Sequence, residues 1–509
     1  MVFGRHWIFA GVEPEIPEPG DFFTIEIGDH SIIIARHDDR GVHAYHNVCR
    51  HRGARLLAAG RGTMGNLVCP YHQWTYDLRG ELIHNQHMGE GFERCRFNLK
   101  PVHLQNLAGL LFICLAETPA PGFAALRAAA QPYIAPHGLA HTKIAFQKDI
   151  IEAGNWKLTM ENNRECYHCV ANHPELIVPL PEYGFGYQPS PDNRARVKDF
   201  EDLLTREHLR WEACGLPSTE IDRLEDPSGF RIVRLPIARA GESQTLDTRI
   251  ASRKLLVTGA RADLGGLSFW TQPNSWHHFM SDHIVSFSVL PVSPDQTLVR
   301  TRWLVHEDAR EGVDYDLQRL TEVWLATNDQ DRALVEIAHR GIRSPAYQPG
   351  PYSPFTEGLV DKFCNWYLAR LSEDLGANPD VKSSPRATSS SAIVDQRARI
   401  VEASPAATSD TRVFSVTFSQ AGRTVPCRAD QTILTAAEAA GLPLPFSCRD
   451  GRCGTCRSRL ICGSVDMKHA GGIRQRQIDQ GDILVCCSRP LTDLVIEKIA
   501  GPRATLAET

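Results

Sequence analysis

Two cysteines and two histidines stand near the N-terminus at a spacing that suits a metal. They occur as Cys49-x-His51 in NVCRHRGARL and, after seventeen residues, as Cys69-x-x-His72 in LVCPYHQWTYDLRG. Thiolate and imidazole are ligands of zinc and of two-iron clusters, and four such residues can also be scattered structural side chains. The set therefore indicates a metal centre, with zinc or a two-iron cluster as its occupant.

The spacing favours a Rieske [2Fe-2S] cluster over zinc. Each histidine follows a cysteine by two or three residues in a Gly-bearing loop, whereas a zinc finger places its histidines along a helix. In a Rieske centre one iron takes two thiolates and the other takes two imidazoles, which raises the reduction potential. We expect Cys49, His51, Cys69 and His72 to hold such a cluster.

A second set of cysteines lies near the other end of the chain. Cys448-x4-Cys453-x2-Cys456 in FSCRDGRCGTCRSRL is followed by Cys486 in ILVCCSRP. This is the spacing of a plant-type [2Fe-2S] cluster, in which a loop supplies three thiolates and a distant cysteine completes the set. Cys487 is the alternative fourth ligand, although an aliphatic strand that runs directly into the ligand favours Cys486.

A pair of histidines in the middle of the chain forms a third candidate site. His168 and His173 in NWKLTMENNRECYHCVANHP are five residues apart, near enough to one helical face to bind one metal. A carboxylate from elsewhere would complete a 2-His-1-carboxylate triad with open positions for oxygen. Taken alone, two histidines at this spacing are more often surface or capping residues.

Composition is that of an ordinary globular protein and limits the possible partners. The chain has 509 residues, 42% hydrophobic and 23% charged, with a formal net charge of -5. No basic excess points to nucleic acid or an anionic membrane, and neither a signal peptide nor a membrane span is recognisable. We expect a cytoplasmic protein. Of its 15 cysteines, those in short clusters with metal-ligand spacing are expected to bind iron, and Cys462 is expected to be a small buried residue.

The elements around the three sites suggest separate domains. Residues 22–115 alternate β-branched or aromatic runs with Gly, Asp and Pro, as in a small antiparallel β domain. Residues 144–375 alternate strand-like runs with helical stretches, as in an α+β domain. The segment 376–412 is rich in Ser, Ala, Pro and Arg and cannot bury a core, so it predicts a flexible linker.

These motifs resemble those of the Rieske non-haem iron oxygenase α subunits. NWK, ENNRECYHC and the HP that follows are similar to the iron-binding segment of that family, over roughly residues 5–375. In the family an aspartate on a late helix is the third ligand, which implies Asp331 in TNDQDRALVE, with Asp329 as the alternative. Relatives carry residues before the segment WIFAGVEPEIPEPGDF, so the resemblance leaves a start upstream of Met1 open.

The resemblance also implies an architecture of three domains and a linker. The expected fold class is α+β, with an antiparallel β Rieske domain, a helix-grip (START-like) catalytic domain with mononuclear Fe(II), and a β-grasp ferredoxin domain. The corresponding ranges are 1–120, 121–375 and 413–509, with the linker at 376–412.

Glu165 precedes His168 by three residues, and the resemblance implies a role for it. The family uses a carboxylate here to bridge the Rieske and mononuclear sites across a subunit boundary, so its partner would be His72. Most members carry Asp, whereas Glu is similar to the subgroup that acts on quaternary ammonium compounds such as glycine betaine, carnitine and stachydrine. A plain helix-surface glutamate is the alternative. An inter-subunit bridge implies a ring, usually a homotrimer in this family.

Electrons should run from the ferredoxin cluster to the Rieske cluster and on to the iron. Plant-type centres lie near about -400 mV and Rieske centres between about -150 and +300 mV. No GxGxxG turn between a strand and a helix is present, so a separate NAD(P)H-dependent flavin reductase is implied. The linker would raise the effective concentration of the ferredoxin domain at the Rieske domain.

The segments QPNSWHHFMSDHIVSFSVLPVSP and RGIRSPAYQPGPYSP resemble the glycine betaine demethylase group. This implies O2-dependent N-demethylation of a quaternary ammonium compound with release of formaldehyde. The alternatives are hydroxylation or O-demethylation of an aromatic acid and, in another class, a non-catalytic electron-transfer protein. Aromatic faces bind such cations, although aromatic residues are more often core. Those available are Trp270, Trp276, Phe279, Tyr183, Phe185 and Tyr187.

Overall fold

The computed structural model forms two compact units. One comprises Met1–Tyr167 and Glu175–Ala377, and the other comprises His168–Pro174 and Asn378–Thr509. The expected linker, apart from Arg412, lies outside the described residues. The structure describes residues 1–58, 60–180, 182, 194–257, 261–375, 412–446, 448–452, 454–473 and 475–498.

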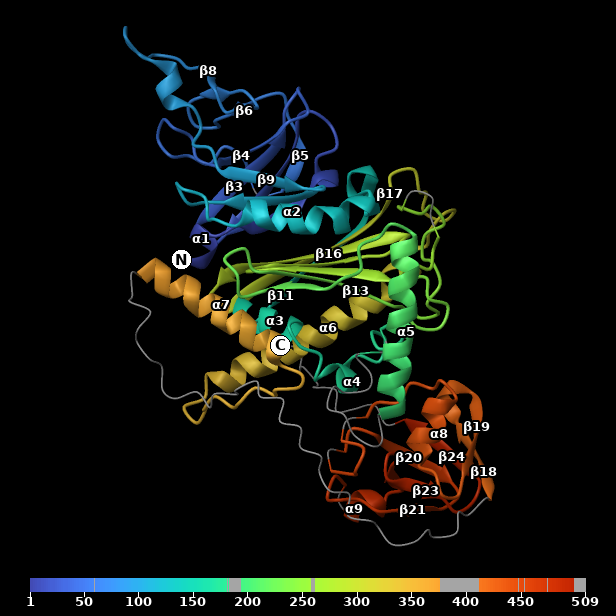
Figure 1. Ribbon diagram of the computed structural model, residues 1–509. Coiled ribbons are helices and arrows are strands. Elements are labelled where there is room, and N and C mark those ends of the chain that lie inside the picture. Colours follow the sequence, from blue (N-terminus) through green and yellow to red (C-terminus); the bar gives the residue numbers. More distant parts are fainter. Residues whose placement is uncertain are drawn as a thin grey trace, which may run out of the picture. The chain divides into compact units, whose positions relative to one another are not determined.

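The N-terminal part of the first unit consists of three small antiparallel sheets (Figure 1), as the alternating β pattern predicts. Their cores are built from alternating aliphatic residues, such as Ile32 and Ile34 on one side of a strand and Ile33 on the other. The strands are β1(Ile8–Val12), β10(Leu110–Cys114) and β9(His103–Leu107); β4(Val42–His46), β3(His30–Arg36), β2(Asp21–Ile27) and β5(Arg61–Thr63); and β6(Leu67–Val68), β7(Thr75–Tyr76) and β8(Leu82–His84). Short helical turns α1(Val2–Arg5), η1(Glu13–Glu15) and η2(Arg94–Phe97) connect them.

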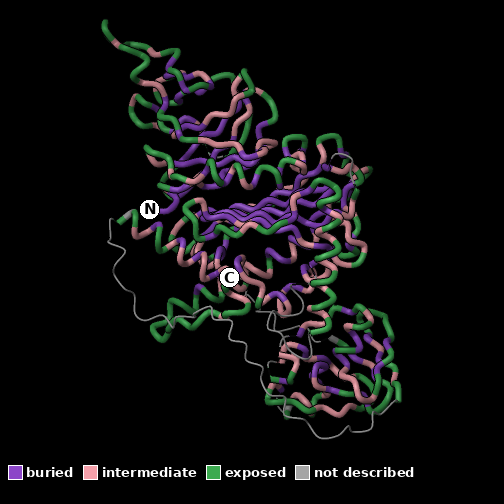
Figure 2. The backbone as a smooth tube through the Cα atoms, in the orientation of Figure 1, coloured by how far each residue is buried: buried purple, intermediate pink, exposed green. Residues whose placement is uncertain are grey.

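A seven-stranded antiparallel sheet is the centre of the first unit. Figure 2 shows its strands as a buried layer. In Figure 1, α2 lies over one face of the sheet, and α3, α6 and α7 lie over the other. The strands, in spatial order, are β11(Thr142–Glu152), β17(Gln296–His306), β16(His283–Ser293), β15(Ser275–Phe279), β14(Gly266–Thr271), β13(Phe230–Leu235) and β12(Ile221–Arg223). The helices are α2(Phe123–Ile134), η3(Ala135–His137), η4(Leu139–His141), α3(Trp156–Asn163), α5(Arg194–Ala213), α6(Leu317–Ile342) and α7(Gly358–Leu375).

The two faces of this sheet bury different kinds of residue. Phe269 and Phe279 belong to a hydrophobic core shared with Phe9, Phe112 and helix α2. Trp270 and Trp276 alternate with them along the same strands and therefore project from the opposite face. The sheet thus separates an apolar core from a face that carries tryptophan, histidine and hydroxyl groups.

The second unit contains a mixed sheet in the order β19-β18-β24-β20-β22, in which β18 and β24 are parallel. Its core includes Val416, Leu434 and Ile496 together with Cys456 and Cys486. With the three N-terminal sheets and the seven-stranded sheet, it confirms the expected α+β class. The elements are β18(Val413–Phe418), η6(Ser419–Ala421), β19(Arg423–Arg428), α8(Ile433–Ala439), β20(Arg457–Cys462), β21(Val465–Met467), α9(Gln475–Ile478), β22(Asp482–Leu484), β23(Ser488–Pro490) and β24(Leu494–Lys498), with α4(Cys169–Asn172) in residues 168–174.

Among the described residues, none of the helices combines the length and the apolar character that a bilayer crossing requires.

Candidate functional site

Cys49 and Cys69 each stand at the start of a short loop that is closed by a backbone hydrogen bond from the cysteine. The Cys49 N–H donates to the carbonyl of Ala54 at 2.8 Å, and the Cys69 N–H donates to the carbonyl of Trp74 at 2.8 Å. Both cysteine side chains are buried within the core of the small sheets. The two loops therefore present two thiols from equivalent positions, as the paired motifs predict.

The two histidines of the same motifs lie against each other. The ring centroids of His51 and His72 are 4.5 Å apart, and the His51 ring stacks on Trp74 at 4.7 Å. Both Nδ1 atoms are buried and have no hydrogen-bond partner among the described residues. A buried nitrogen without a partner is costly unless it binds a metal, so these atoms fit a cluster that takes two imidazoles.

Tyr76 adds a polar contact to the cluster loop that sequence analysis missed. Its hydroxyl oxygen accepts the Arg50 N–H at 3.0 Å, which leaves the hydroxyl proton directed to the Cys49 sulfur at 3.4 Å. Burial raises the pKa of Tyr76, so the proton remains on the hydroxyl. The position of Tyr76 in TYDLRG, after the second motif, was the available signal.

The second cysteine set is partly described, because Cys453 lies outside the described residues. The Arg452 N–H donates to the Cys448 sulfur at 3.2 Å. Cys456 and Cys486 are buried in one core, and a hydrogen bond from the Cys456 thiol lowers the pKa of Cys486. Backbone N–H groups directed at cysteine sulfurs stabilise thiolates, as an iron–sulfur cluster requires.

The surroundings of the Cys487 sulfur bear on the choice between Cys486 and Cys487 as the fourth ligand. Gly451 has a φ of +75°, and a Cβ there would lie 2.8 Å from the Cys487 sulfur. The Cys487 sulfur lies 3.6 Å from the carbonyl of Leu484, within its own turn. These contacts favour Cys486 as the fourth ligand, which stays a prediction.

The expectation that Cys462 is buried is wrong. Cys462 is exposed at the end of β20. A bulge between Leu460 and Cys462 disturbs the pairing with β24, so the inside–outside alternation of the strand is lost there.

The histidine pair of the central motif is brought together by a single helical turn. His168 and His173 do not share a helix face as expected; they stand immediately before and after α4. Their ring centroids lie 5.0 Å apart. The Cys169 sulfur lies beside them, because one ligand atom from each of the three residues lies within 4.8 Å of the others, but this sulfur is in a disulfide bond and is not a free ligand. Sequence analysis did not consider Cys169, although it directly follows His168.

Helix α6 distinguishes the two candidate aspartates. Asp331 is half-buried and accepts a hydrogen bond from Nδ2 of Asn162 at 2.7 Å. Asp329 is exposed and pairs with Arg332 at 3.4 Å. Burial, together with the nearby Asp331 carboxylate, raises the pKa of Glu152 to about 7. These environments favour Asp331 as the iron ligand; its coordination together with His168 and His173 stays a prediction.

Glu165 lies just beyond the end of α3 rather than on the helix surface. It lines a surface hollow together with Glu161, Glu357 and Tyr352. Its carboxylate accepts the backbone N–H of Tyr167. The residue is half-buried, and the hollow is accessible from outside this chain. If Glu165 bridges to His72 of another subunit, as predicted, that subunit would approach this acidic, accessible hollow.

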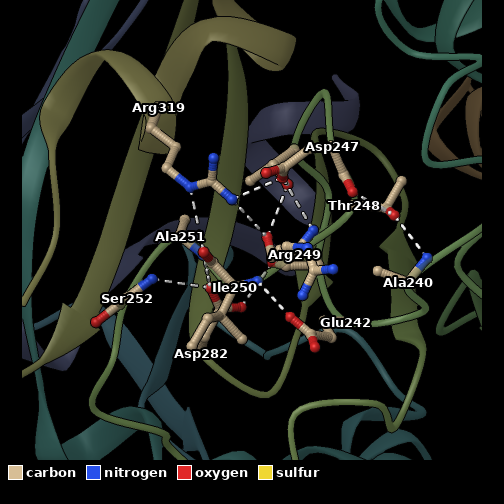
Figure 3. A network of polar contacts seen from close by, with 12 residues as sticks. Ala240, Glu242, Asp247, Thr248, Arg249, Ile250, Ala251, Ser252, Asp282 and Arg319 are labelled. Atoms are coloured by element: carbon tan, nitrogen blue, oxygen red, sulfur yellow. Dashed lines mark hydrogen bonds and ion pairs between the residues drawn. The ribbon is translucent and has the colours of Figure 1, made fainter.

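A network of polar contacts fixes the N-terminal part of α6 (Figure 3). Arg319 donates to Oδ1 of Asp247 at 2.6 Å and to the carbonyl of Ile250 at 3.2 Å. The fully buried Asp282 accepts the N–H groups of Ala251 and Ser252 at 2.6 and 3.1 Å. The network holds the loop against the helix that carries Asp331.

The aromatic residues proposed for substrate have different positions. Trp270 and Trp276 form a directly opposite pair on β14 and β15, and Trp276 stacks on Phe287 at 4.7 Å. Phe279 lies in the hydrophobic core on the other face and is core rather than cage. Tyr183, Phe185 and Tyr187 lie outside the described residues.

Comparisons with known families match three separate parts of the chain. Family profiles described as "Rieske [2Fe-2S] domain", "Ring hydroxylating alpha subunit (catalytic domain)" and "2Fe-2S iron-sulfur cluster binding domain" match residues 6–104, 139–373 and 416–491. The glycine betaine monooxygenase oxygenase subunit of Chromohalobacter salexigens is 46% identical over 375 residues, which are 73% of this chain and 82% of that protein. The subunit of the same name from Pseudomonas aeruginosa strain UCBPP-PA14 is 44% identical over 378 residues, 74% of this chain and 86% of that protein.

Solved structures share the fold. A quaternary ammonium Rieske monooxygenase in complex with an inhibitor has a TM-score of 0.51 at 22% identity, covering 72% of this chain and 89% of that one. Naphthalene 1,2-dioxygenase from Rhodococcus sp. has a TM-score of 0.53 at 18% identity, covering 73% and 90%. The chain belongs to the Rieske non-haem iron oxygenases, as an α subunit with a Rieske cluster and a mononuclear iron, joined to a plant-type [2Fe-2S] ferredoxin domain.

Proposed function

We propose that this enzyme N-demethylates a quaternary ammonium compound, with glycine betaine as the first candidate. The observation that carries the proposal is the 46% identity to a glycine betaine monooxygenase oxygenase subunit across the Rieske and catalytic domains together. Glu165, the residue typical of the quaternary ammonium subgroup, supports it.

The reaction balances with one O2, two electrons and two protons. One oxygen atom is inserted into a C–H bond of an N-methyl group, and the other leaves as water. The resulting N-hydroxymethyl cation breaks its C–N bond: nitrogen keeps the electron pair, formaldehyde leaves, and the hydroxyl proton is released. Glycine betaine would therefore yield dimethylglycine. The mononuclear iron supplies the activation of O2 when bound.

The described residues support this chemistry in separate roles. His168 and His173 would hold the iron with Asp331, while Asn162 orients the Asp331 carboxylate through its 2.7 Å hydrogen bond. Glu165 would connect the mononuclear site with His72 of a neighbouring subunit, in a trimer. The acidic hollow around Glu165 is suited to meet the Rieske tip, where Arg50 and Arg52 are exposed.

Electrons would enter through the C-terminal cluster, held by Cys448, Cys453, Cys456 and Cys486. A separate NAD(P)H-dependent flavin reductase would reduce it. The thiols of Cys49 and Cys69 and the imidazoles of His51 and His72 would hold the acceptor cluster, whose higher potential makes the transfer favourable.

The test is substrate-dependent formaldehyde release. Anaerobically purified protein is mixed with a flavin reductase and NADH, and oxygen uptake and formaldehyde are measured with glycine betaine, carnitine, proline betaine and choline. We expect formaldehyde in equal amount to oxygen consumed for one of the first three, and none for His168→Ala. Oxygen uptake coupled to hydroxylation of an aromatic acid, without formaldehyde from any onium compound, would leave an oxygenase of a different substrate class.

A further inference from the structure

Arg164 is a buried cation whose hydrogen bonds go to neutral groups. Its side chain follows α3 and is fully buried. Nη1 donates to Oδ1 of Asn163 at 2.5 Å, and Nη2 donates to the carbonyl of Thr271 at 3.3 Å. Nη2 also lies 3.5 Å from Oε1 of Gln272, while the Nε–H has no acceptor among the residues that the structure describes. Burial lowers the pKa of Arg164 to about 9, which still leaves the guanidinium charged at neutral pH.

Two other buried arginines of the same unit, Arg302 and Arg36, have carboxylate partners, whereas a third, Arg234, has none among the described residues. Arg302 lies 3.1 Å from Glu15, and Arg36 lies 3.0 Å from Glu13. Among the described residues, Arg164 forms no ion pair. Burying a charge without a counter-ion costs several kcal/mol. Arg164, unlike Arg234, lies beside Trp270 on the face of the sheet that carries the tryptophans, so an anion bound on that face would offset this cost.

The position of Arg164 places it on the site face of the seven-stranded sheet. Its guanidinium carbon lies 5.0 Å from the ring centroid of Trp270. The same face carries Thr301, whose hydroxyl accepts from Asn328 of α6 at 3.0 Å. Asn162, two residues before Arg164, donates to Asp331. Arg164 therefore lies at the end of the helix that also positions the expected iron ligand.

A row of aromatic side chains extends from Arg164 across this face. Trp270 is directly opposite Trp276, which is directly opposite Phe287. Phe287 in turn lies 5.1 Å from Trp324 of α6. The indole N–H groups of Trp270 and Trp276 are buried and have no acceptor within the described part of the chain. Aromatic faces bind onium cations, and a guanidinium with free N–H groups binds a carboxylate through paired hydrogen bonds.

We propose that Arg164 binds the carboxylate of a zwitterionic quaternary ammonium substrate, whose onium group lies over the aromatic row at Trp276 and Phe287. This proposal rests on the function proposed above and names the residue that would determine which onium compounds the enzyme prefers. Arg164 would make the enzyme prefer onium compounds that carry a carboxylate over those that lack one. The substrate anion would then supply the counter-charge that no described residue provides.

The test compares glycine betaine with choline, which has the same trimethylammonium group and a hydroxyl in place of the carboxylate. Kd for each is measured by calorimetry on the anaerobic, iron-loaded protein for the wild type, Arg164→Met and Arg164→Lys. A charge-assisted hydrogen bond contributes about 1.5–3 kcal/mol, so we expect Arg164→Met to weaken glycine betaine roughly 10- to 100-fold and to leave choline nearly unchanged. Arg164→Lys, which keeps the charge but loses the paired geometry, should recover part of the selectivity.

Arg234→Met is the matched control. Arg234 is also fully buried and stacks over a tryptophan, Trp211, but its Nη2 lies 3.2 Å from Nε2 of His137. It belongs to β13 at a position that alternates with Val233, so it faces away from the aromatic row. This variant should leave the ratio of the two Kd values unchanged.

The outcomes separate the two proposals. An equal loss of both ligands in Arg164→Met, with retained cluster absorbance, would mean a structural role and would overturn the assignment. If the wild type binds no onium compound and oxidises an aromatic acid, the proposed function fails. The Arg164 assignment is then tested by the ratio of the Kd values of that acid and its amide. If Arg164→Met leaves this ratio unchanged, the assignment is overturned.

Discussion

We expect Tyr76 to tune the Rieske cluster through a hydrogen bond to a cluster ligand. Its hydroxyl donates toward the Cys49 sulfur at 3.4 Å while it accepts the Arg50 N–H. A donor to a cluster sulfur stabilises the reduced, more negative state and so raises the reduction potential. Tyr76→Phe should lower the Rieske potential by roughly 40 mV, because a hydrogen bond contributes about 1 kcal/mol and 59 mV corresponds to a tenfold change for one electron.

The measurement for Tyr76→Phe is a redox titration followed by electron paramagnetic resonance, which distinguishes the two clusters. Tyr45→Phe is the control, because the Tyr45 hydroxyl reaches only the carbonyl of Leu78, at 3.5 Å. An unchanged Rieske potential in Tyr76→Phe would refute the role of its hydroxyl.

Asp331 and Asp329 offer a direct comparison two residues apart. Asp331→Ala should lose the mononuclear iron, since a facial triad with one ligand missing binds weakly, while both clusters keep their visible absorbance. Asp329→Ala, which removes only an exposed ion pair with Arg332, should keep full iron content. Iron is measured by plasma emission and compared with the cluster absorbance. Iron loss in Asp329→Ala alone would reverse the assignment.

At the scale of elements, the loop that leads into β16 has a buried charge at its base. Asp282 accepts from Ser243 at 2.7 Å and from two backbone N–H groups, and it lies 3.1 Å from Nδ1 of His283. Although burial alone would raise it, the charge of His283 and these hydrogen bonds lower the pKa of Asp282 below its ordinary value. The contribution to stability is therefore present above the unfolded-state pKa, near pH 4, and is lost as the pH falls further.

Asp282→Asn should destabilise the catalytic domain by about 3 kcal/mol at pH 7, because it removes one partner from a buried polar network. The difference from the wild type should begin to shrink below about pH 4, where the carboxyl becomes protonated in the unfolded chain, and should vanish only below the lower pKa of the folded state. Calorimetric unfolding at pH 7 and at pH 3.5 checks this. Asp308→Asn, an exposed position, should have little effect at either pH. If the difference in unfolding free energy between the wild type and Asp282→Asn is the same at both pH values, the variant is destabilised by altered packing and not by the loss of a charge.

Sequence patterns predict the regular elements of this chain better than the local geometry of its sites. The aliphatic alternation of SIIIARH and the long amphipathic segment around TNDQDRALVE correspond to β3 and α6. The histidine pair was expected on one helix face, but α4 is a single turn with His168 and His173 at its two ends. A helical pattern of residues is recognised over several turns, so it cannot show that a helix ends after a single turn.

Tertiary contacts determine what the spacing of residues left open. Trp276 and Phe279 lie in one strand and were equivalent as candidates for a cation cage, yet only the register of the sheet assigns them to opposite faces. The sequence does not single out Arg164, because only the tertiary structure shows that this buried arginine has no carboxylate partner among the described residues. The bulge at the end of β20 exposes Cys462 for a similar reason.

At the scale of the whole molecule, the fused ferredoxin domain predicts kinetics that do not depend on dilution. We expect a protease site inserted at position 395 to leave turnover unchanged before cleavage, because both clusters stay on one chain. After cleavage, turnover at micromolar enzyme should fall several-fold, since tethering supplies up to millimolar effective concentrations. Excess separate ferredoxin domain should restore it. Turnover that is unaffected by cleavage would show that the tether does not limit electron delivery.

The two-faced sheet has a consequence for how this enzyme can change over evolutionary time. Along β14 and β15, residues of the hydrophobic core alternate with residues of the opposite face, which include Trp270 and Trp276 of the aromatic row. A one-residue insertion in either strand would exchange the two sets and damage the core and the aromatic row together. Substrate range should therefore diversify among descendants by replacement at alternate positions of these strands, while insertions and deletions accumulate in the connecting loops.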